Sequence, residues 1–424
     1  MKKKVSVSQL EPGMYVSDFN NGWNEDARSG KDPNGLPQQM MLKSDADVRR
    51  VLADSTIREV YIDTERGRDV EGAKSQAEIE AELAAQMMEL GEEGNAVKLP
   101  NPDVKKQPME QELEHAHEVK QKARRLVGDM LDDVRLGKTI TVGPVKELMK
   151  DMVESMFSNK DAMLSLSMIK AKDEYTFMHS VNVGVFLVAF AQSMEMTPEE
   201  LVAVGVGAML HDIGKMKTPQ EVLNKPGKLD DEEFLQMKMH VVHSEKILAA
   251  APGISELSVQ IAGRHHERWD GSGYPRQLKG HAIGQMGQMS AIVDVYDAIT
   301  SDRCYHKGNS PHQALKRMME WSKFHFNPDL FQKFVQCVGI YPMGTLVRLH
   351  NGYLGVVLET NTESLLHPVV RVLIDSKAKK KLKPVTLNLI ERKADKNWAV
   401  EGVEDARKWG VDPKKHMPKP ELFQ

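Results

Sequence analysis

Apolar residues recur with helical spacing through the middle of this chain and with strand spacing at its two ends. In residues 145–157 they stand at i, i+3, i+4 and i+7, which lines one face of a helix. Residues 109–136 carry a narrower apolar stripe among charged side chains, which predicts a long helix. Residues 201–210 are apolar on all sides and predict a buried helix that ends at a His-Asp pair. The pattern therefore predicts a helical block over residues 109–338.

The two ends of the chain follow another pattern. Residues 1–72 alternate short β-type runs with turn clusters, which predicts a small α+β domain. Residues 73–108 begin rich in Ala, Glu and Gln and end in Gly, Asn and Pro, so that a helical connector and a loop are expected there. Residues 339–424 return to β-branched runs and predict a β-rich appendage and tail. The expected fold class is mainly α, with strands at both ends.

Composition excludes several classes of protein. The 424 residues carry 57 Lys and Arg against 61 Asp and Glu, and this balance argues against a general binder of DNA, RNA or membrane surfaces. The two cysteines, Cys304 and Cys337, form no CxxC pattern, which fits a reducing compartment. Because no stretch approaches the ~20 apolar residues of a membrane helix, we expect a cytoplasmic protein without membrane insertion.

The chemistry is concentrated between His179 and Asp294. Seven of the fifteen histidines lie there, several beside carboxylates or beside each other. A His-Asp pair offers one nitrogen and two oxygen donors, and the carboxylate can bridge two ions. Mixed imidazole and carboxylate donors suit zinc, iron or manganese better than calcium or magnesium. If His265 and His266 lie on a helix, their side chains point about 100° apart, which suits either adjacent ions or two sites around one bridging group. A lone histidine on an apolar helix is usually a core residue, so the role of His179 depends on the whole set.

Two motifs in this block resemble those of a known family. The runs HDIGK at residues 211–215 and HHERWDGSGYP at residues 265–275 match the signatures of HD-GYP domains, a branch of the HD metal-dependent phosphohydrolases. The stretch of about 175–305 resembles such a domain. The resemblance implies a helical bundle that hydrolyses cyclic di-GMP to linear pGpG and/or GMP with a metal-activated bridging hydroxide. Residues up to about 72 resemble, more weakly, a domain of unknown function often found ahead of HD-GYP modules.

The resemblance implies a role for each matching position. Asp212 would bridge the ions and Lys215 would hold a phosphate oxygen, so these two carry the catalytic role. Substrate would also contact Gly273, Tyr274 and Arg303. The implied metal ligands are His179, His211, Asp212, His240, His265, His266 and Asp294.

The number of ions follows from a departure from the family's pattern. Some members bind a third metal with a glutamate four positions before the first ligand histidine, where this chain has Tyr175. The adjacent Glu174 lies about 100° round the helix and is not expected to substitute. The resemblance therefore implies two divalent transition metal ions, iron or manganese first, with zinc, nickel or cobalt as alternatives.

Two further residues are candidates for supporting the site. His306 stands where the family has a lysine or arginine on the phosphate-contacting side, with Lys307 next to it. Asp297 follows Asp294 by three residues and so shares its helix face. It is either an orienting group for the site or a helix-end cap or salt bridge.

Alternatives of different classes remain open. The chain is an active cyclic di-GMP phosphodiesterase, or a low-activity cyclic-dinucleotide receptor that docks proteins such as diguanylate cyclases (GGDEF proteins) through its Gly-Tyr-Pro loop. An enzymatic variant would hydrolyse another cyclic dinucleotide such as cyclic GMP-AMP. The intact ligand set favours catalysis. The helix at 109–136 is a candidate homodimer stalk, although intramolecular packing fits its stripe as well.

Overall fold

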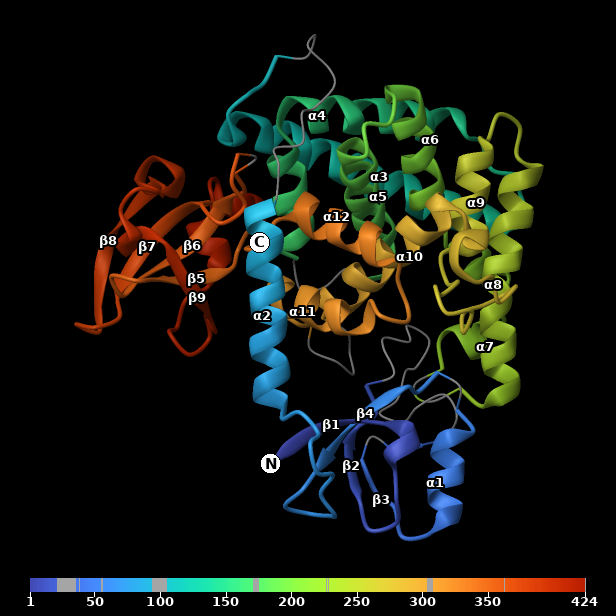
Figure 1. Cartoon of the computed structure of the whole chain (residues 1–424). Helices are drawn as coiled ribbons and strands as arrows, with labels where there is room; N and C mark the ends of the chain where they lie inside the picture. Colours follow the sequence, from blue (N-terminus) through green and yellow to red (C-terminus); the bar gives the residue numbers. More distant parts are fainter. Residues whose placement is uncertain are drawn as a thin grey trace.

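A helical body joins two smaller strand-rich parts (Figure 1). The computed structural model describes residues 1–20, 36–37, 39–54, 56–93, 105–170, 175–225, 227, 229–302, 308–361 and 363–423. The fold is mainly α with a sheet at each end, which confirms the predicted fold class. Among the described residues, none of the helices combines the length and hydropathy needed to cross a bilayer.

The N-terminal part is a four-stranded antiparallel sheet with one helix. The strands follow the order β1-β4-β2-β3, with β1 (Lys2–Ser6), β2 (Tyr15–Asp18), β3 (Met40–Met41) and β4 (Glu59–Asp63). Helix α1 (Asp45–Leu52) begins at a capping box between Ser44 and Asp47, which satisfies backbone N–H groups of its first turn. The buried side chains of this part form a core cluster separate from that of the helical body.

A polar contact joins this sheet to the helical body. Glu320 lies on α11 (Pro311–Trp321), and its Oε1 accepts from Lys4 Nζ at 2.8 Å, Tyr61 Oη at 2.7 Å and Asn20 Nδ2 at 3.1 Å. The exposed fractions of the Lys4 and Glu320 side chains are only 6% and 11%. The N-terminal sheet is therefore positioned on the helical body by a shielded charge pair as well as by packing.

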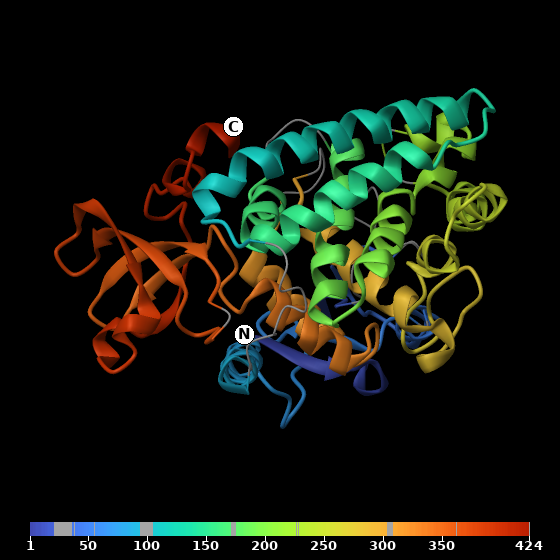
Figure 2. The same ribbon diagram turned by 90° about the horizontal axis from the view of Figure 1, so that it is seen from above.

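The long helix predicted over residues 109–136 is α3 (Met109–Arg135). The connector helix α2 (Gln76–Glu93) precedes it. Helix α4 (Gly143–Met168) bends at Asn159, whose side chain accepts from the N–H of Asp161 and restarts the helix. Figure 2 shows α3 and α4 side by side over the body. The apolar stripe of α3 is buried in this packing.

The remaining helices of the body follow α4. They are α5 (Tyr175–Ser193), α6 (Pro198–Met209), α7 (Gln220–Leu223), α8 (Asp231–Ala250), α9 (Glu256–Arg264), α10 (Gln285–Thr300) and α12 (Pro328–Val338). Among them, α6, α10 and α12 pack against α5. Helix α6 is the buried helix predicted before the His-Asp pair. Capping boxes at Thr197 and Asp230 begin α6 and α8. All of these helices except α7 contribute to one continuous apolar core, whereas Val222 of α7 packs in a small separate cluster with Leu229 and Met237.

The C-terminal part is an antiparallel sheet in the order β8-β7-β6-β5-β9. Its strands are β5 (Leu346–Leu349), β6 (Tyr353–Glu359), β7 (Val369–Asp375), β8 (Lys380–Asn388) and β9 (Val400–Glu404). The β-rich appendage was predicted. Strand β8 escaped prediction because its residues are largely exposed and rich in lysine, so that it shows little apolar alternation.

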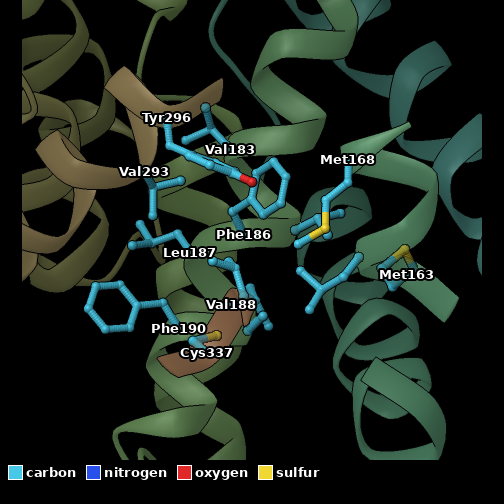
Figure 3. Close-up of a cluster of buried hydrophobic side chains, with 14 of the residues drawn as sticks. Met163, Met168, Val183, Phe186, Leu187, Val188, Phe190, Val293, Tyr296 and Cys337 are labelled. Atoms are coloured by element: carbon cyan, nitrogen blue, oxygen red, sulfur yellow. The ribbon is translucent and has the colours of Figure 1, made fainter. Parts of the chain in front are cut away.

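A tyrosine hydroxyl lies inside the core. Tyr296 on α10 is 1% exposed, and its ring meets Phe186 and Phe334 edge to face at 5.2 and 5.1 Å between centroids. Figure 3 shows its oxygen beside Phe186 among apolar side chains. No hydrogen-bond partner for this oxygen is found in the described part of the chain. A buried hydroxyl without a partner destabilises a fold by about 1–3 kcal/mol.

We expect Tyr296→Phe to raise the free energy of unfolding by about 1 kcal/mol, because the orphaned hydroxyl is removed while the ring is kept. Chemical denaturation followed by circular dichroism measures the change. Tyr341→Phe is the matched control, since the Tyr341 hydroxyl contacts Met88 Sδ at 3.3 Å and its removal offers no such gain. If Tyr296→Phe lost as much stability as Tyr341→Phe, or more, the Tyr296 hydroxyl would have a hydrogen-bond partner in solution.

Candidate metal centre

The seven predicted ligands converge in the middle of the helical body. They come from α5 (His179), the turn after α6 (His211, Asp212), α8 (His240), the turn after α9 (His265, His266) and α10 (Asp294). Six of the seven side chains are buried, and His266 is nearly so. Residues separated by 115 positions in sequence are thus brought to one place: His179 Nε2 lies 3.1 Å from Asp294 Oδ1.

Backbone carbonyls orient three of these imidazoles. The Nδ1 atoms of His211, His240 and His265 lie 2.6, 2.7 and 2.9 Å from the carbonyl oxygens of Ala208, Met237 and Ala262. Each carbonyl belongs to the residue three positions earlier. Because a carbonyl can only accept a hydrogen bond, Nδ1 carries the proton and Nε2 keeps its lone pair. The local helical geometry therefore directs three lone pairs into the site.

Two of these lone pairs face each other. His240 Nε2 and His265 Nε2 are 3.4 Å apart, and both rings are buried. With both Nδ1 atoms protonated, two unprotonated nitrogens at this distance repel unless a cation or a proton lies between them. His211 Nε2 and His266 Nε2 are buried and form no hydrogen bond among the described residues. This arrangement fits the binding of a metal ion.

Asp212 presents one oxygen to each half of the site. Its Oδ1 lies 3.3 Å from His240 Nε2 and 3.8 Å from His265 Nε2. Its Oδ2 lies 3.4 Å from His211 Nε2 and 3.8 Å from His179 Nε2. A carboxylate with its two oxygens turned to different donor sets can bridge two ions.

The donors group into overlapping sets in which all ligand atoms lie within 4.8 Å of one another. Imidazole and carboxylate donors of this kind suit divalent transition metals. The residues present therefore fit the divalent metal binding expected for this kind of site. The sets are His179 with His211 and Asp294, His240 with His265 and His266, and His211 with Asp212 and His265.

Burial and neighbouring charges shift the pKa values of the donors in different directions. Burial holds the pKa of His265 well below its usual value, and the pKa of His266 is lowered by burial as well, so both imidazoles are neutral and free to coordinate. Burial opposes the charged form of Asp212, but Lys215 and then His211 outweigh it and lower its pKa well below the usual value. Burial also lowers the pKa of His211, but Asp212 and Asp294 together raise it above its usual value, so His211 must lose a proton when it binds a metal.

The position of the histidine pair differs from the prediction. Helix α9 ends at Arg264, so His265 is its C-cap and His266 lies in the following turn. Their ring centroids are 4.2 Å apart, with an interplanar angle of 44°. The pair reaches both halves of the site, because His266 Nδ1 lies 3.8 Å from Asp294 Oδ2 while His265 faces Asp212.

The last three residues of the HDIGK motif begin a short 3-10 helix (Ile213–Lys217) that packs against α8. Lys215 Nζ lies 2.6 Å from Asp212 Oδ2, which places an ammonium group at the edge of the site. Gly214 donates its N–H to Ser244 Oγ at 2.8 Å. A Cβ at Gly214 would stand 2.1 Å from the His240 carbonyl oxygen and 2.4 Å from Ser244 N. Glycine is therefore required for the contact that places His240, and the role of Ser244 was missed from the sequence.

The Gly-Tyr-Pro loop folds back on the histidine pair. Tyr274 donates its N–H to the His266 carbonyl at 3.1 Å, and its ring lies 4.7 Å from that of His266 between centroids. A Cβ at Gly273 would stand 2.4 Å from Arg268 N, so this glycine allows the loop to pack on the backbone. Glu267, which sequence reasoning gave no role, accepts the N–H groups of Arg276 and Leu278 at 2.8 and 2.9 Å and closes the loop.

The other predicted residues divide into two groups. Asp297 is fully buried, and its Oδ2 lies 2.8 Å from His179 Nδ1, which is the arrangement of an orienting carboxylate. Burial opposes its charged form, but Lys170 and then His179 hold its pKa below the usual value. Arg303 and His306 lie outside the described residues, as does Glu174, and the side chain of Tyr175 is not described either.

Three protein families match this chain. Residues 162–330 match the HD domain, residues 2–145 match a domain of unknown function (DUF3391), and residues 346–395 match the KOW domain associated with the HD domain. The HD match contains all seven predicted ligands. The DUF3391 match extends past the predicted boundary at residue 72 and spans α2 and α3.

Relatives of this chain include enzymes that act on cyclic dinucleotides. A cyclic di-GMP phosphodiesterase of Pseudomonas aeruginosa is 39% identical over 381 residues, which cover 89% of this chain and 87% of that protein. A cyclic di-GMP phosphodiesterase of Vibrio cholerae is 36% identical over 217 residues, 46% of this chain and 44% of that protein. A 3'3'-cGAMP-specific phosphodiesterase of Vibrio cholerae is 39% identical over 157 residues, 37% of this chain and 36% of that protein.

Proposed function

Because this chain belongs to the HD-GYP family of HD-domain phosphohydrolases, we propose that it is a phosphodiesterase that hydrolyses cyclic di-GMP to linear pGpG and/or GMP. The observation that carries the proposal is the complete donor set around Asp212, whose two oxygens face different groups of imidazoles. A relative named for this activity matches nearly the whole chain. Divalent metal-dependent hydrolysis is common to HD-domain phosphohydrolases in general.

We propose two ions, iron or manganese, held in two halves that share Asp212. One half is His179, His211 and Asp294, and the other is His240, His265 and His266. When bound, the ions would supply Lewis acidity that lowers the pKa of water and polarises a phosphoryl oxygen. The protein contributes imidazoles whose orientation is fixed before binding, together with a buried site from which bulk water is largely excluded.

Lys215 is proposed to hold a non-bridging phosphate oxygen. Its ammonium lies beside Asp212, and 17% of its side-chain surface is exposed. The positive charge would stabilise the negative charge that develops at phosphorus, and this effect is larger in a shielded site than in water. Tyr274, beside the His266 ring, is proposed to contact the dinucleotide, with Gly273 and Arg303.

We expect Lys215→Met to lower turnover by about 100-fold or more, in the range measured for loss of one charge-stabilising donor, while metal content falls less than two-fold. Turnover is followed by chromatography of cyclic di-GMP, and metal content by mass spectrometry of the digested protein. Lys217→Met is the matched control, because Lys217 lies on the same 3-10 helix and is exposed. Parallel losses of metal and turnover would make Lys215 a structural residue.

Cyclic GMP-AMP is the second candidate substrate, favoured by the 39% identity to a 3'3'-cGAMP-specific enzyme. The low-activity receptor is the third candidate, although a chain that only senses nucleotide has no need for every ligand. The test is to purify the protein anaerobically, measure its metal, and compare hydrolysis of cyclic di-GMP, cyclic GMP-AMP and cyclic di-AMP. Faster turnover of cyclic GMP-AMP than of cyclic di-GMP would make cyclic GMP-AMP the substrate. Tight binding without turnover of any of the three would support a receptor function.

A further inference from the structure

The ligand histidines are oriented by two different kinds of group. His211, His240 and His265 donate Nδ1–H to backbone carbonyls of their own segments. His179 instead pairs its Nδ1 with the side chain of Asp297, at 2.8 Å from Oδ2. A backbone carbonyl is fixed by the helix, whereas a carboxylate can rotate about its side-chain bonds. The orientation of His179 therefore depends on what holds Asp297.

Lys170 holds Asp297 from the other side. Its Nζ lies 2.6 Å from Asp297 Oδ1 and 2.8 Å from the Asp297 carbonyl oxygen. It also lies 2.9 Å from Thr300 Oγ1 and 2.7 Å from Ser301 Oγ. These contacts gather at the C-terminal end of α10, where a cation interacts favourably with the helix dipole. One ammonium group thus fixes both the side chain of Asp297 and the end of the helix that carries Asp294.

The burial of this group of residues makes the pairing necessary. The Asp297 side chain has no exposed surface, and the exposed fraction of the Lys170 side chain is 16%. A carboxylate removed from water requires a partner charge and hydrogen bonds to remain stable. Each oxygen of Asp297 faces a different partner, because Oδ1 lies beside Lys170 and Oδ2 lies beside His179.

We propose that Lys170 is a positioning residue of the metal centre, which fixes Asp297 so that His179 presents Nε2 to an ion. The inference rests on the proposed metal centre. His179 Nε2 lies beside Asp294 and Asp212, so the effect is directed to the half formed by His179, His211 and Asp294. In the described part of the chain no hydrogen bond or ion pair joins Asp297 to the half formed by His240, His265 and His266.

The test measures metal affinity of the full-length protein. Lys170→Met keeps the length of the side chain but removes its charge and donors. Titration of metal-free protein with Co²⁺ against a chromogenic chelator gives the affinity for each ion, and the visible absorption of Co²⁺ reports on its ligands. We expect one of the two ions to bind about 10- to 100-fold more weakly, the usual effect of losing a group that orients a metal ligand, with an altered spectrum. The second ion should bind with affinity within about three-fold of wild type.

Two variants separate positioning from a general effect on the fold. Lys160→Met is the matched control, because the Lys160 side chain of the helical body is 17% exposed and also lies beside a carboxylate, 3.2 Å from Asp161 Oδ1. We expect wild-type affinity for both ions in this control. Lys170→Arg should restore most of the affinity lost in Lys170→Met, since a guanidinium keeps the charge and can reach several acceptors.

Asp297→Asn completes the design as a double-mutant cycle, and it remains informative if Lys170→Met does not fold, in which case Lys170→Gln takes its place. If Lys170 acts through Asp297, its removal in the Asp297→Asn background should weaken binding by no more than about two-fold. Full additivity, or a folded Lys170→Met protein that binds both ions as wild type does, would overturn the inference. Failure of the wild-type protein to bind Co²⁺ would instead reject the proposed metal centre.

Discussion

Replacing Asp212 by asparagine is expected to lower turnover by at least about 1,000-fold and to leave fewer than two ions per chain. Each Asp212 oxygen faces a different group of imidazoles, so the change to a neutral amide weakens both halves of the site at once. Loss of several kcal/mol of charge stabilisation corresponds to this range, since each 1.4 kcal/mol is about ten-fold in rate. Metal analysis and a cyclic di-GMP assay on the same preparation measure both effects.

Asp230→Asn provides the control for Asp212→Asn. Asp230 caps α8, the helix that carries His240, and asparagine caps helices about as well as aspartate does. The control should therefore keep two ions and wild-type turnover. An Asp212→Asn protein with full metal content and full turnover would refute the bridging role.

Replacing Gly214 by alanine is expected to lower the free energy of unfolding by about 3 kcal/mol, at the upper end of overpacking effects, and to weaken metal binding by His240. The added Cβ would stand 2.1 Å from the His240 carbonyl oxygen, well inside van der Waals contact. The obstruction is backbone, so α8 must move away from the HDIGK segment, and His240 moves with it. Denaturation curves and Co²⁺ titration measure the two effects.

Gly184→Ala is the matched control for Gly214→Ala. Gly184 lies within α5, and among the described residues no heavy atom outside the neighbouring turns of α5 stands within 4 Å of a Cβ built there. Alanine in a helix is about 0.5–1 kcal/mol more favourable than glycine, so this variant should be more stable than wild type and should bind metal normally. A Gly214→Ala protein as stable as Gly184→Ala would mean that α8 does not depend on the close approach.

The sequence predicted the parts of the fold that have a strong local pattern. The helix over 201–210 and the helix over 109–136 were found because their apolar residues recur with helical spacing. Helix α1 and strand β3 were missed, since the surrounding residues are polar and β3 has only two residues. The division at residues 72, 108 and 338 stays a prediction.

The site was predictable in its donors but not in its geometry. The two motifs and the spaced histidines indicated the seven side chains that converge, because residue types at fixed spacing are visible in a single sequence. The turn at His265 was not visible, as helix ends depend on tertiary packing. Lys170 and Ser244 were also missed, because neither residue type nor spacing distinguishes them from ordinary polar residues. Their roles arise only when α10 and α8 pack against the ligand-bearing segments.

The most direct test of the account is the rate of cyclic di-GMP hydrolysis as Mn²⁺ or, under anaerobic conditions, Fe²⁺ is added to the metal-free protein. The account predicts no hydrolysis without metal and a rise that levels off at two ions per chain. Hydrolysis by the metal-free protein, or a substrate that stays intact at every loading of both metals, would contradict it.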